Sequence, residues 1–216
     1  MERNQQTYDM FVQLVTRLVI EELEKFQRSV PIGVSNRHIH LDRADMDALF
    51  GQDSELTFKK ELGQPGQYAA EETVTLHGPK GELGRVRVLG PLRSESQVEV
   101  SVTDGFALGV RPPIRESGKL KGTPGVTIVG PKGSIEKDTG TIAALRHIHL
   151  DPETAQRIGV KDKQMVKVEI GGLRGGIFHN VLIRVSEQFA PEMHIDVDEA
   201  NAFGVKNGDR AYIIVD

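Results

Sequence analysis

Two pairs of histidines offer the chemistry that is easiest to recognise in this chain. His38 and His40 flank one isoleucine, and His147 and His149 flank another. In a β-strand successive side chains point to opposite faces, so each segment would place both imidazoles on one face and its isoleucine on the other. Two neighbouring neutral imidazoles are a suitable start for a divalent metal site.

The two pairs stand in a longer repeat. Arg37-His-Ile-His-Leu-Asp42 recurs residue for residue as Arg146-His-Ile-His-Leu-Asp151, and in both copies a short predicted helix follows and ends near a glycine, Gly51 or Gly159. A six-residue identity is unexpected by chance and indicates an internal repeat. A lone pair would be weak support for a metal, but duplication with the flanks strengthens it. Two surface pairs left by an old gene duplication are the alternative.

Each pair needs at least one further ligand, plus an open position if the metal is catalytic. His194 lies in a segment that predicts a short strand running into a helix, and it is the best candidate for a fifth histidine ligand. Glu99 stands in an alternating strand that could aim it at the same centre, although a solvated strand face would also explain it. His77 and His179 are interpreted as ordinary surface or packing residues.

One arginine is placed where an anion could be bound. Arg93 follows a Gly-Pro-Leu turn between two predicted strands, where a guanidinium could hold an oxyanion with two hydrogen bonds. A solvent-facing turn arginine is the alternative. The sequence contains no Walker-type loop, no Gly-X-Ser-X-Gly elbow and no Gly-X-Gly-X-X-Gly fingerprint, so ATP-dependent, serine-hydrolase and dinucleotide functions lose support.

The composition narrows the class of protein further. The 216 residues are 38% hydrophobic, which is enough for one or two small domains, and the net charge of −4 argues against nucleic acid as the main partner. Because there are no cysteines, a metal must be held by His, Asp or Glu. No apolar run reaches the roughly 20 residues that span a bilayer, and no secretory signal is visible, so we expect a cytoplasmic protein.

The first part of the chain predicts a long helix. Apolar residues recur at three- and four-residue steps over residues 6–27, and Val30-Pro31 ends the pattern because the residue before proline is disfavoured in a helix. We expect this helix to pack on the chain's own core or on a dimer mate. The alternative is a detachable amphipathic tag that docks the protein to a partner or a shell.

The remainder alternates short apolar runs with glycine and proline turns. The predicted strands are 72–76, 84–89, 96–103, 126–130, 164–169, 181–184 and 211–215, the predicted helices are 42–49 and 198–203, and residues 111–125 are a predicted loop. Two turns share one sequence, Gly78-Pro-Lys-Gly81 and Gly130-Pro-Lys-Gly133. Two small β-barrels or sandwiches with short helices fit this rhythm.

Six segments of this chain resemble the PduL-type phosphate propanoyltransferases, a family of phosphotransacylases. They run in order from about residue 31 to residue 214: Ser35-Asn-Arg-His-Ile-His-Leu41, Gln64-Pro-Gly-Gln67, Arg87-Val-Leu-Gly-Pro91, Gln97-Val-Glu99, Arg146-His-Ile-His-Leu150 and His194-Ile-Asp-Val-Asp-Glu-Ala-Asn201. The paired histidine motifs are highly specific. The resemblance implies a mainly β fold of two small β-barrel domains with short capping helices, in addition to the N-terminal amphipathic helix.

We therefore predict a helical extension over residues 1–29, a first barrel from residues 30–76 and 141–216, and a second barrel from residues 77–140. The resemblance implies two zinc ions between the barrels. It assigns His38, His40 and Glu99 to one zinc, His147, His149 and His194 to the other, Arg93 to phosphate, and Ser35, Lys60, Arg87, Leu89 and Asn201 to coenzyme A. It further implies a homodimer. Since some members carry such a helix as a tag, residues 1–29 could direct the protein into a bacterial microcompartment.

The implied reaction interconverts acyl-CoA and phosphate with acyl phosphate and CoA, with propanoyl-CoA and also acetyl-CoA as acyl donors. No cysteine is present to carry a thioester intermediate, so we expect direct attack by phosphate. A dinuclear zinc thioesterase or other hydrolase would need the same ligands. A non-enzymatic zinc-binding scaffold barrel is a further alternative, but five histidines and one carboxylate leave each of two metals an open position, which favours catalysis.

Overall fold

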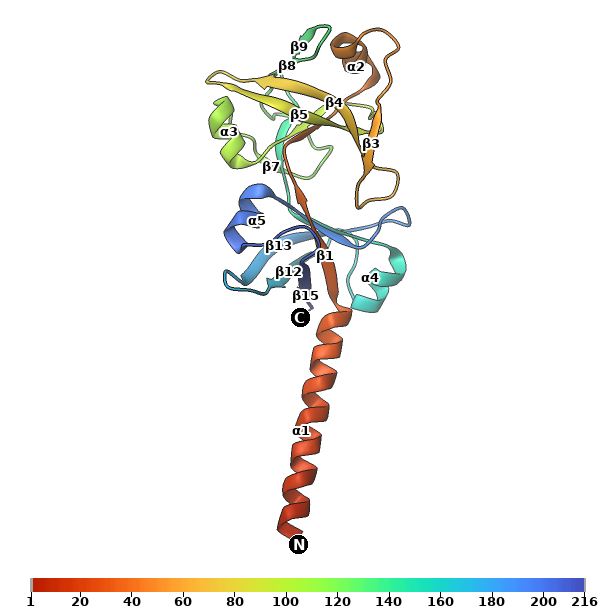
Figure 1. Cartoon of the computed structure of the whole chain (residues 1–216), viewed down its shortest axis with the longest axis vertical. Helices are drawn as coiled ribbons and strands as arrows, with labels where there is room; N and C mark the ends of the chain where they lie inside the picture. Colours follow the sequence, from red (N-terminus) through yellow and green to blue (C-terminus); the bar gives the residue numbers. More distant parts are fainter. Residues whose placement is uncertain (1, 216) are drawn as a thin grey trace.

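The computed structural model describes the backbone of residues 2–215 and the side chains of residues 6–215; residues 1 and 216, the ends of the predicted ranges, lie outside it. The chain forms one long helix and two β units that follow one another along the long axis of the molecule (Figure 1). Within the described residues, none of the helices combines the length and the apolar character needed to cross a membrane.

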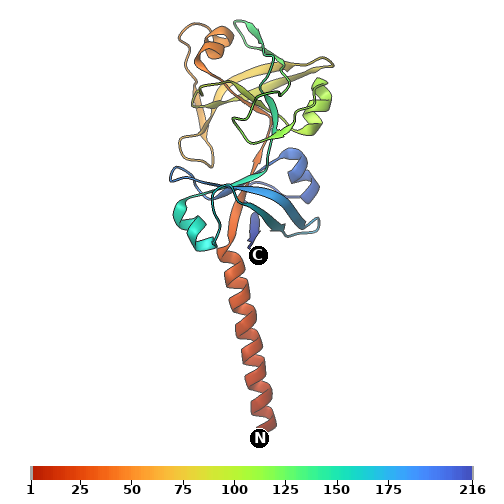
Figure 2. The ribbon, with the colours of Figure 1, turned by 180° about the vertical axis from the view of Figure 1, so that it is seen from behind.

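The long helix α1 (Glu2–Gln27) projects away from the β units in both views (Figures 1 and 2). The predicted helix is confirmed, but packing on the chain's own core is not: Met10 is 71% exposed and Phe11 is 62% exposed. Only the last turns approach the body, where Lys25 Nζ lies 3.0 Å from a Glu169 oxygen and the Arg210 guanidinium lies 5.2 Å from the Phe26 ring centroid. Among the side chains that the structure describes, most of the apolar face of α1 therefore stays exposed to solvent.

The β unit next to α1 is a closed six-stranded barrel. In spatial order its strands are β1 (Ser29–Ser35), β14 (Glu192–Asp196), β11 (His147–Leu150), β13 (Gly176–Val185), β12 (Met165–Ile170) and β15 (Arg210–Ile214). Alternate residues point inward, as in β12, where Val166, Val168 and Ile170 are buried. Two short helices accompany the barrel, α4 (Pro152–Ile158) and α5 (Val197–Phe203).

The second unit is an open, curled sheet rather than a second closed barrel. Its strands in order are β7 (Ile114–Arg115), β10 (Thr141–Ala144), β6 (Gln97–Glu99), β2 (His38–His40), β5 (Glu82–Gly90), β4 (Tyr68–His77), β8 (Thr127–Val129) and β9 (Ser134–Glu136), with β3 (Phe58–Glu61) paired to β4. The strands at the two ends of this order, β7 and β9, have two and three residues and do not meet. The mainly β prediction is confirmed, with one barrel closed.

Two short helices belong to the sheet unit, α2 (Arg43–Phe50) and α3 (Val102–Leu108). The strand predicted over residues 96–103 ends at Glu99, because Ser101 and Asp104 form a capping box that starts α3. The predicted helix at Asp42 is confirmed, since the Asp42 side chain accepts the Asp45 amide as an N-cap.

The strand pairing places the boundary between the two units at other residues than the predicted ones. Strands β2 to β4, residues 38–77, pair within the open sheet, so only the part of the predicted 30–76 segment that forms β1 belongs to the barrel. The chain returns to the barrel between β10 and β11. The predicted boundaries differ from the observed ones because long-range strand pairing decides which unit a strand joins. His38 lies between Arg87 and Glu99 of the neighbouring strands, and a local sequence pattern does not reveal such pairing.

The two Gly-Pro-Lys-Gly turns have the same task in the sheet unit. Lys80 N donates to Leu108 O at the end of α3, and Lys132 N donates to Leu49 O near the end of α2, each at 3.0 Å. A Cβ atom on Gly78 would lie 2.2 Å from Leu108 O, and one on Gly130 would lie 2.4 Å from Leu49 O. Each turn therefore caps a helix C-terminus, and each needs glycine for the close approach.

Candidate metal centres and active site

Four strand-to-helix connections carry the candidate ligands to the region where the two units meet. Strands β2, β6, β11 and β14 lead directly into α2, α3, α4 and α5. In each connection the last candidate ligand stands two residues before the N-cap: His40 before Asp42, Glu99 before Ser101, His149 before Asp151, and His194 before Asp196. Strand pairing before the ligand and a helix cap after it hold the backbone on both sides.

Antiparallel pairing completes each group of candidate ligands. His38 lies opposite Glu99 on β2 and β6, and His147 lies opposite His194 on β11 and β14. Residues directly opposite one another share a face of the sheet. The structure thus brings together the predicted sets, which we call the sheet site (His38, His40, Glu99) and the barrel site (His147, His149, His194); within each site the ligand atoms all lie within 4.8 Å of one another.

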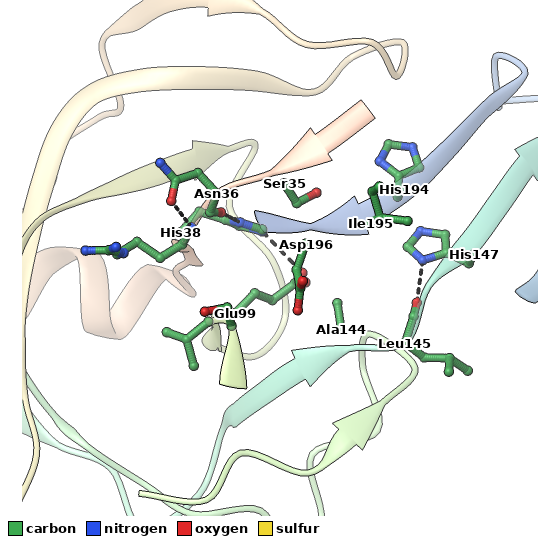
Figure 3. A pocket seen from close by; sticks show the side chains of 13 residues that line it. Ser35, Asn36, His38, Glu99, Ala144, Leu145, His147, His194, Ile195 and Asp196 are labelled. Atoms are coloured by element: carbon green, nitrogen blue, oxygen red, sulfur yellow. Dashed lines mark hydrogen bonds and ion pairs between the residues drawn. The ribbon is translucent and has the colours of Figure 1, made fainter. Parts of the chain in front are cut away.

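The first histidine of each pair is oriented by a backbone carbonyl. His38 Nδ1 lies 2.8 Å from Asn36 O, and His147 Nδ1 lies 2.8 Å from Leu145 O (Figure 3). If Nδ1–H donates to the carbonyl, Nε2 keeps its lone pair for a metal, which is a common way of fixing a metal-binding histidine. His38 Nε2 lies 3.4 Å from a Glu99 oxygen.

Several nitrogens of the two sites are buried and lack a hydrogen-bond partner among the described residues: His40 Nδ1, both ring nitrogens of His149, and His194 Nε2. His194 Nε2 is 3.2 Å from a Glu192 oxygen, an ion-pair distance that does not amount to a hydrogen bond. Unsatisfied buried nitrogens are costly, and a metal ion would satisfy them. The nitrogen and oxygen donors of both sites are ligands that zinc accepts, so the residues present fit this metal.

Burial keeps His40 and the three barrel-site histidines in the form that binds metal. Burial, with the neighbouring His194, lowers the pKa of His147 to about 4, and burial with His147 lowers the pKa of His149 to about 2. Burial and the Arg184 charge lower the pKa of His194 to about 4, and burial holds the pKa of His40 well below its ordinary value. These imidazoles are therefore neutral at pH 7, and protons do not compete for them.

Glu99 is held by side chains that the sequence analysis did not select. Gln97 Nε2 donates to Glu99 Oε1 at 2.5 Å and to Ser117 Oγ at 2.8 Å, while Gly118 N donates to Gln97 Oε1 at 2.7 Å. Gln97 is almost completely buried. Its position two residues before Glu99 on the same strand face was the only local signal of this role.

The arginine that precedes each histidine pair in the repeat forms an equivalent ion pair in both copies. Arg37 Nη2 lies 3.0 Å from Asp104, and Arg146 Nη1 lies 3.3 Å from Glu199. Asp104 and Glu199 are the third residues of α3 and α5, where each completes a capping box. Each arginine thus links its own ligand strand to the helix that follows the opposite ligand strand. This explains why the arginine is repeated together with the histidines.

One cavity of about 390 Å³ joins the two sites and contains the anion-binding candidate. Arg93 reaches it from the sheet unit, where Arg93 N donates to Leu41 O at 2.8 Å and the guanidinium donates to Ser117 Oγ at 3.2 Å. Burial lowers the pKa of Arg93. An arginine side chain keeps its positive charge in proteins, so the guanidinium can bind an anion. A second guanidinium, Arg184 of β13, lines the same cavity from the barrel unit, and sequence reasoning did not identify it.

The coenzyme A candidates are more widely spread. Ser35 and Leu89 line the cavity beside the histidines. Arg87 is partly exposed and donates to Ala70 O at 2.9 Å and Glu71 O at 2.7 Å. Lys60 on β3 and Asn201 on α5 are exposed.

Comparison of this sequence with known proteins identifies a family. The family model described as phosphate propanoyltransferase matches residues 31–206. Proteins named phosphate propanoyltransferase are similar to this chain: that of Rhodobacter capsulatus is 63% identical over 178 residues, 82% of this chain and 83% of its own. That of Thermotoga maritima is 56% identical over 90% of this chain and 93% of its own, and that of Salmonella typhimurium is 54% identical over 91% and 92%. This chain belongs to the phosphate propanoyltransferase family of acyltransferases.

Proposed function

We propose that this chain is a zinc-dependent phosphotransacylase that interconverts propanoyl-CoA and phosphate with propanoyl phosphate and CoA. The observation that supports zinc dependence most is the presence of two preformed ligand groups with buried, unsatisfied nitrogens around one cavity. Acetyl-CoA is proposed as a second acyl donor. It differs from propanoyl-CoA by one methylene, for which an apolar pocket discriminates by only about 1–3 kcal/mol.

In this proposal the sheet site holds one zinc ion and the barrel site holds the other. Bound zinc would polarise the thioester carbonyl and favour the departing thiolate. Arg93 binds phosphate and offsets the charge repulsion of its approach, while Ser117 steadies the guanidinium. A phosphate oxygen forms the bond to the acyl carbon, the carbon–sulfur bond breaks, and CoA leaves as its thiolate. The chain has no cysteine that could carry the acyl group as a thioester.

The proposed coenzyme A site extends outward from the cavity. Ser35 and Leu89 lie beside the histidines and would contact the thiol end of the molecule. The positive charges of Lys60 and Arg87 suit the phosphate groups of CoA, and Asn201 offers an exposed amide. Weaker acyl-CoA binding by Lys60→Gln, with an unchanged KM for phosphate, would support this assignment.

The decisive test is CoA release by the purified protein from propanoyl-CoA and from acetyl-CoA, with and without phosphate, and with and without a chelator. We expect release that requires phosphate, stops when metal is removed and returns when zinc is added. Release without phosphate would instead indicate a zinc thioesterase. No release by zinc-loaded protein would favour the scaffold function.

We also propose that α1 is a docking element, either for a second copy of this chain in a homodimer or for a bacterial microcompartment component. Its exposed apolar face and its few contacts with the body support this. Leu14→Glu combined with Leu18→Glu should remove the apolar face without touching the catalytic cavity. If α1 mediates dimerisation, light scattering should detect a smaller mass for this variant than for the wild type; an unchanged mass, with loss of co-assembly with shell proteins, would indicate the second role.

A further inference from the structure

Arg184 occupies a position that the proposed mechanism leaves unused. It lies on β13, where parallel pairing sets it beside His149 of β11. Side chains in register on neighbouring strands share a face, so Arg184 accompanies the barrel-site histidines into the cavity. Arg93 enters the same cavity from the sheet unit, and the two guanidinium groups therefore belong to walls from different units.

The protein places the Arg184 side chain without neutralising it. Its Nε lies 4.0 Å from Glu116 Oε1, and its guanidinium carbon lies 5.5 Å from the Phe189 ring centroid. Phe189 in turn stacks on His149 with a centroid distance of 3.9 Å. Among residues 6–215, no hydrogen bond from the Arg184 guanidinium to the chain accompanies these contacts.

Glu116 is already engaged by closer cations. Lys119 Nζ lies 2.7 Å from one of its oxygens, and Lys163 forms an ion pair with the other. Hydrogen bonds from these two lysines lower the pKa of Glu116 to about 2, and the bond from Lys119 has the larger effect. The Arg184 charge is therefore only weakly balanced, although its side chain is just 26% exposed.

Two guanidinium groups that line one partly enclosed cavity repel each other. Burial is the main cause that lowers the pKa of Arg93; the Glu99 charge opposes this shift, and the charge of Arg184 adds to it. An anion with several oxygens would relieve that repulsion by accepting hydrogen bonds from both groups. Phosphate and the phosphoryl end of an acyl phosphate have this chemistry. A water molecule, the attacking group of a thioesterase, carries no charge that would require it.

We propose that Arg184 is a second phosphate-binding residue, which with Arg93 forms a clamp on inorganic phosphate and on the phosphoryl group of the acyl phosphate. This inference rests on the proposed phosphotransacylase function and extends it. The clamp spans the barrel and the sheet, so binding of phosphate draws on both units. It also favours phosphate over water as the group that attacks the thioester.

The test uses Arg184→Gln and Arg184→Lys in the full-length, zinc-loaded protein. For Arg184→Gln we expect the KM for phosphate to rise by about tenfold or more, because a charge-assisted hydrogen bond to a dianion is lost. The KM for propanoyl-CoA, the zinc content and the melting temperature should stay close to those of the wild type. Arg184→Lys keeps the charge but not the forked geometry and should give an intermediate KM.

Lys119→Gln is the matched control, since it removes a cation from the same Glu116 carboxylate at a 70% exposed side chain. It should leave the KM for phosphate unchanged. The proposal is overturned if Arg184→Gln leaves that KM unchanged, if it raises both KM values equally, or if its zinc content falls. In the last case Arg184 would be a structural support of the barrel site.

A second readout separates this proposal from the proposed function. Broadening of the ³¹P signal of inorganic phosphate measures binding without CoA and without turnover. Weaker broadening with Arg184→Gln than with the wild type supports the clamp, even if the wild type releases CoA without phosphate and the phosphotransacylase function fails. Equal broadening by both proteins would contradict the clamp whatever the assay shows.

Discussion

The sheet site and the barrel site have the same arrangement of strands and helices but differ in their candidate ligands. In both, a His-X-His strand pairs with an antiparallel strand that supplies the third ligand, and both strands lead into capped helices. Register makes Glu99 of the sheet site the counterpart of His194 of the barrel site. A zinc ion with three neutral histidines keeps one more positive charge than a zinc ion with two histidines and a carboxylate. If both sites hold zinc as proposed, the metal of the barrel site should therefore be the stronger electrophile.

The side chains two residues before Glu99 and His194 also differ in chemical character. Gln97, two residues before Glu99, donates an amide hydrogen to that carboxylate. Glu192, two residues before His194, places a carboxylate oxygen 3.2 Å from the imidazole and accepts a hydrogen bond from Gln64 at 3.1 Å. A donor accompanies the acidic ligand and an acceptor accompanies the basic one. The two sites thus share one arrangement of strands and helices, while the residues on the second strand of each site differ in chemical type.

The largest effect should come from breaking either site at its second histidine. His40→Ala and His149→Ala should each lower phosphate-dependent CoA release at least about 100-fold, beyond the 10–100-fold typical of supporting residues, and each should remove one zinc ion. Metal analysis and initial rates measure both effects. His179→Ala, on an exposed part of β13, is the control and should behave as the wild type. Full activity in His40→Ala would mean that the sheet site is dispensable.

The next effect should distinguish the two supporting side chains. Gln97→Leu removes the hydrogen bonds to Glu99, Ser117 and Gly118 together, so we expect the zinc affinity of the sheet site to fall about 10–100-fold. Chelator competition would measure this affinity. Glu192→Gln should change the affinity of the barrel site less, because His194 Nε2 makes no hydrogen bond to Glu192. A larger loss in Glu192→Gln would mean that the carboxylate participates directly in metal binding.

Acidification should destabilise the metal-free protein through the barrel site. The folded-state pKa values of His147 and His194 are about 4, below the ordinary value of 6.5, so below pH 6.5 the unfolded chain binds more protons than the folded one. Stability should therefore fall as the pH drops from about 6.5 toward 4, by at most about 1.4 kcal/mol per pH unit for each such histidine. Urea unfolding of metal-free protein at pH 7 and pH 5 would measure the loss. His194→Gln should lose less than the wild type; an equal loss would assign the effect to other groups.

The smallest expected effect is a difference in stability between variants of the two repeated arginines. Arg37 pairs with buried Asp104, whereas Arg146 pairs with Glu199, whose pKa is raised to about 7 by burial first and by nearby carboxylates. Glu199 can take up a proton when its partner is lost. Loss of Arg37 would leave the buried Asp104 side chain without its ion-pair partner. Arg37→Gln should thus cost roughly 1 kcal/mol more than Arg146→Gln at pH 7. Paired urea titrations test this, and equal costs would show that the two capping boxes are equally tolerant.

Much of the candidate site followed from short-range patterns. Period-two alternation predicted that each histidine pair shares a face, and Asp42 and Asp198 marked two of the helices that follow the ligand strands, although α5 begins one residue earlier. The exact repeat indicated two equivalent sites. The helix α3 was missed because its first residues, Val102 and Thr103, favour a strand, while the capping box of Ser101 decides for a helix. Gln97 and Arg184 were missed because their partners are far apart in the sequence or on another strand.

The sequence by itself determined the donor types, their pairing on strand faces and the helix cap at Asp42, because these depend on residues within one strand or one turn. Tertiary contacts created the need for glycine in the two repeated turns, where Leu108 O and Leu49 O approach closely. Tertiary structure alone decided that one unit closes while the other stays open, and that residues 38–77 belong to the sheet. It also decided that Arg93 and Arg184 share one cavity. These features depend on strand register and packing between segments distant in the chain, where one set of local patterns is compatible with many pairings.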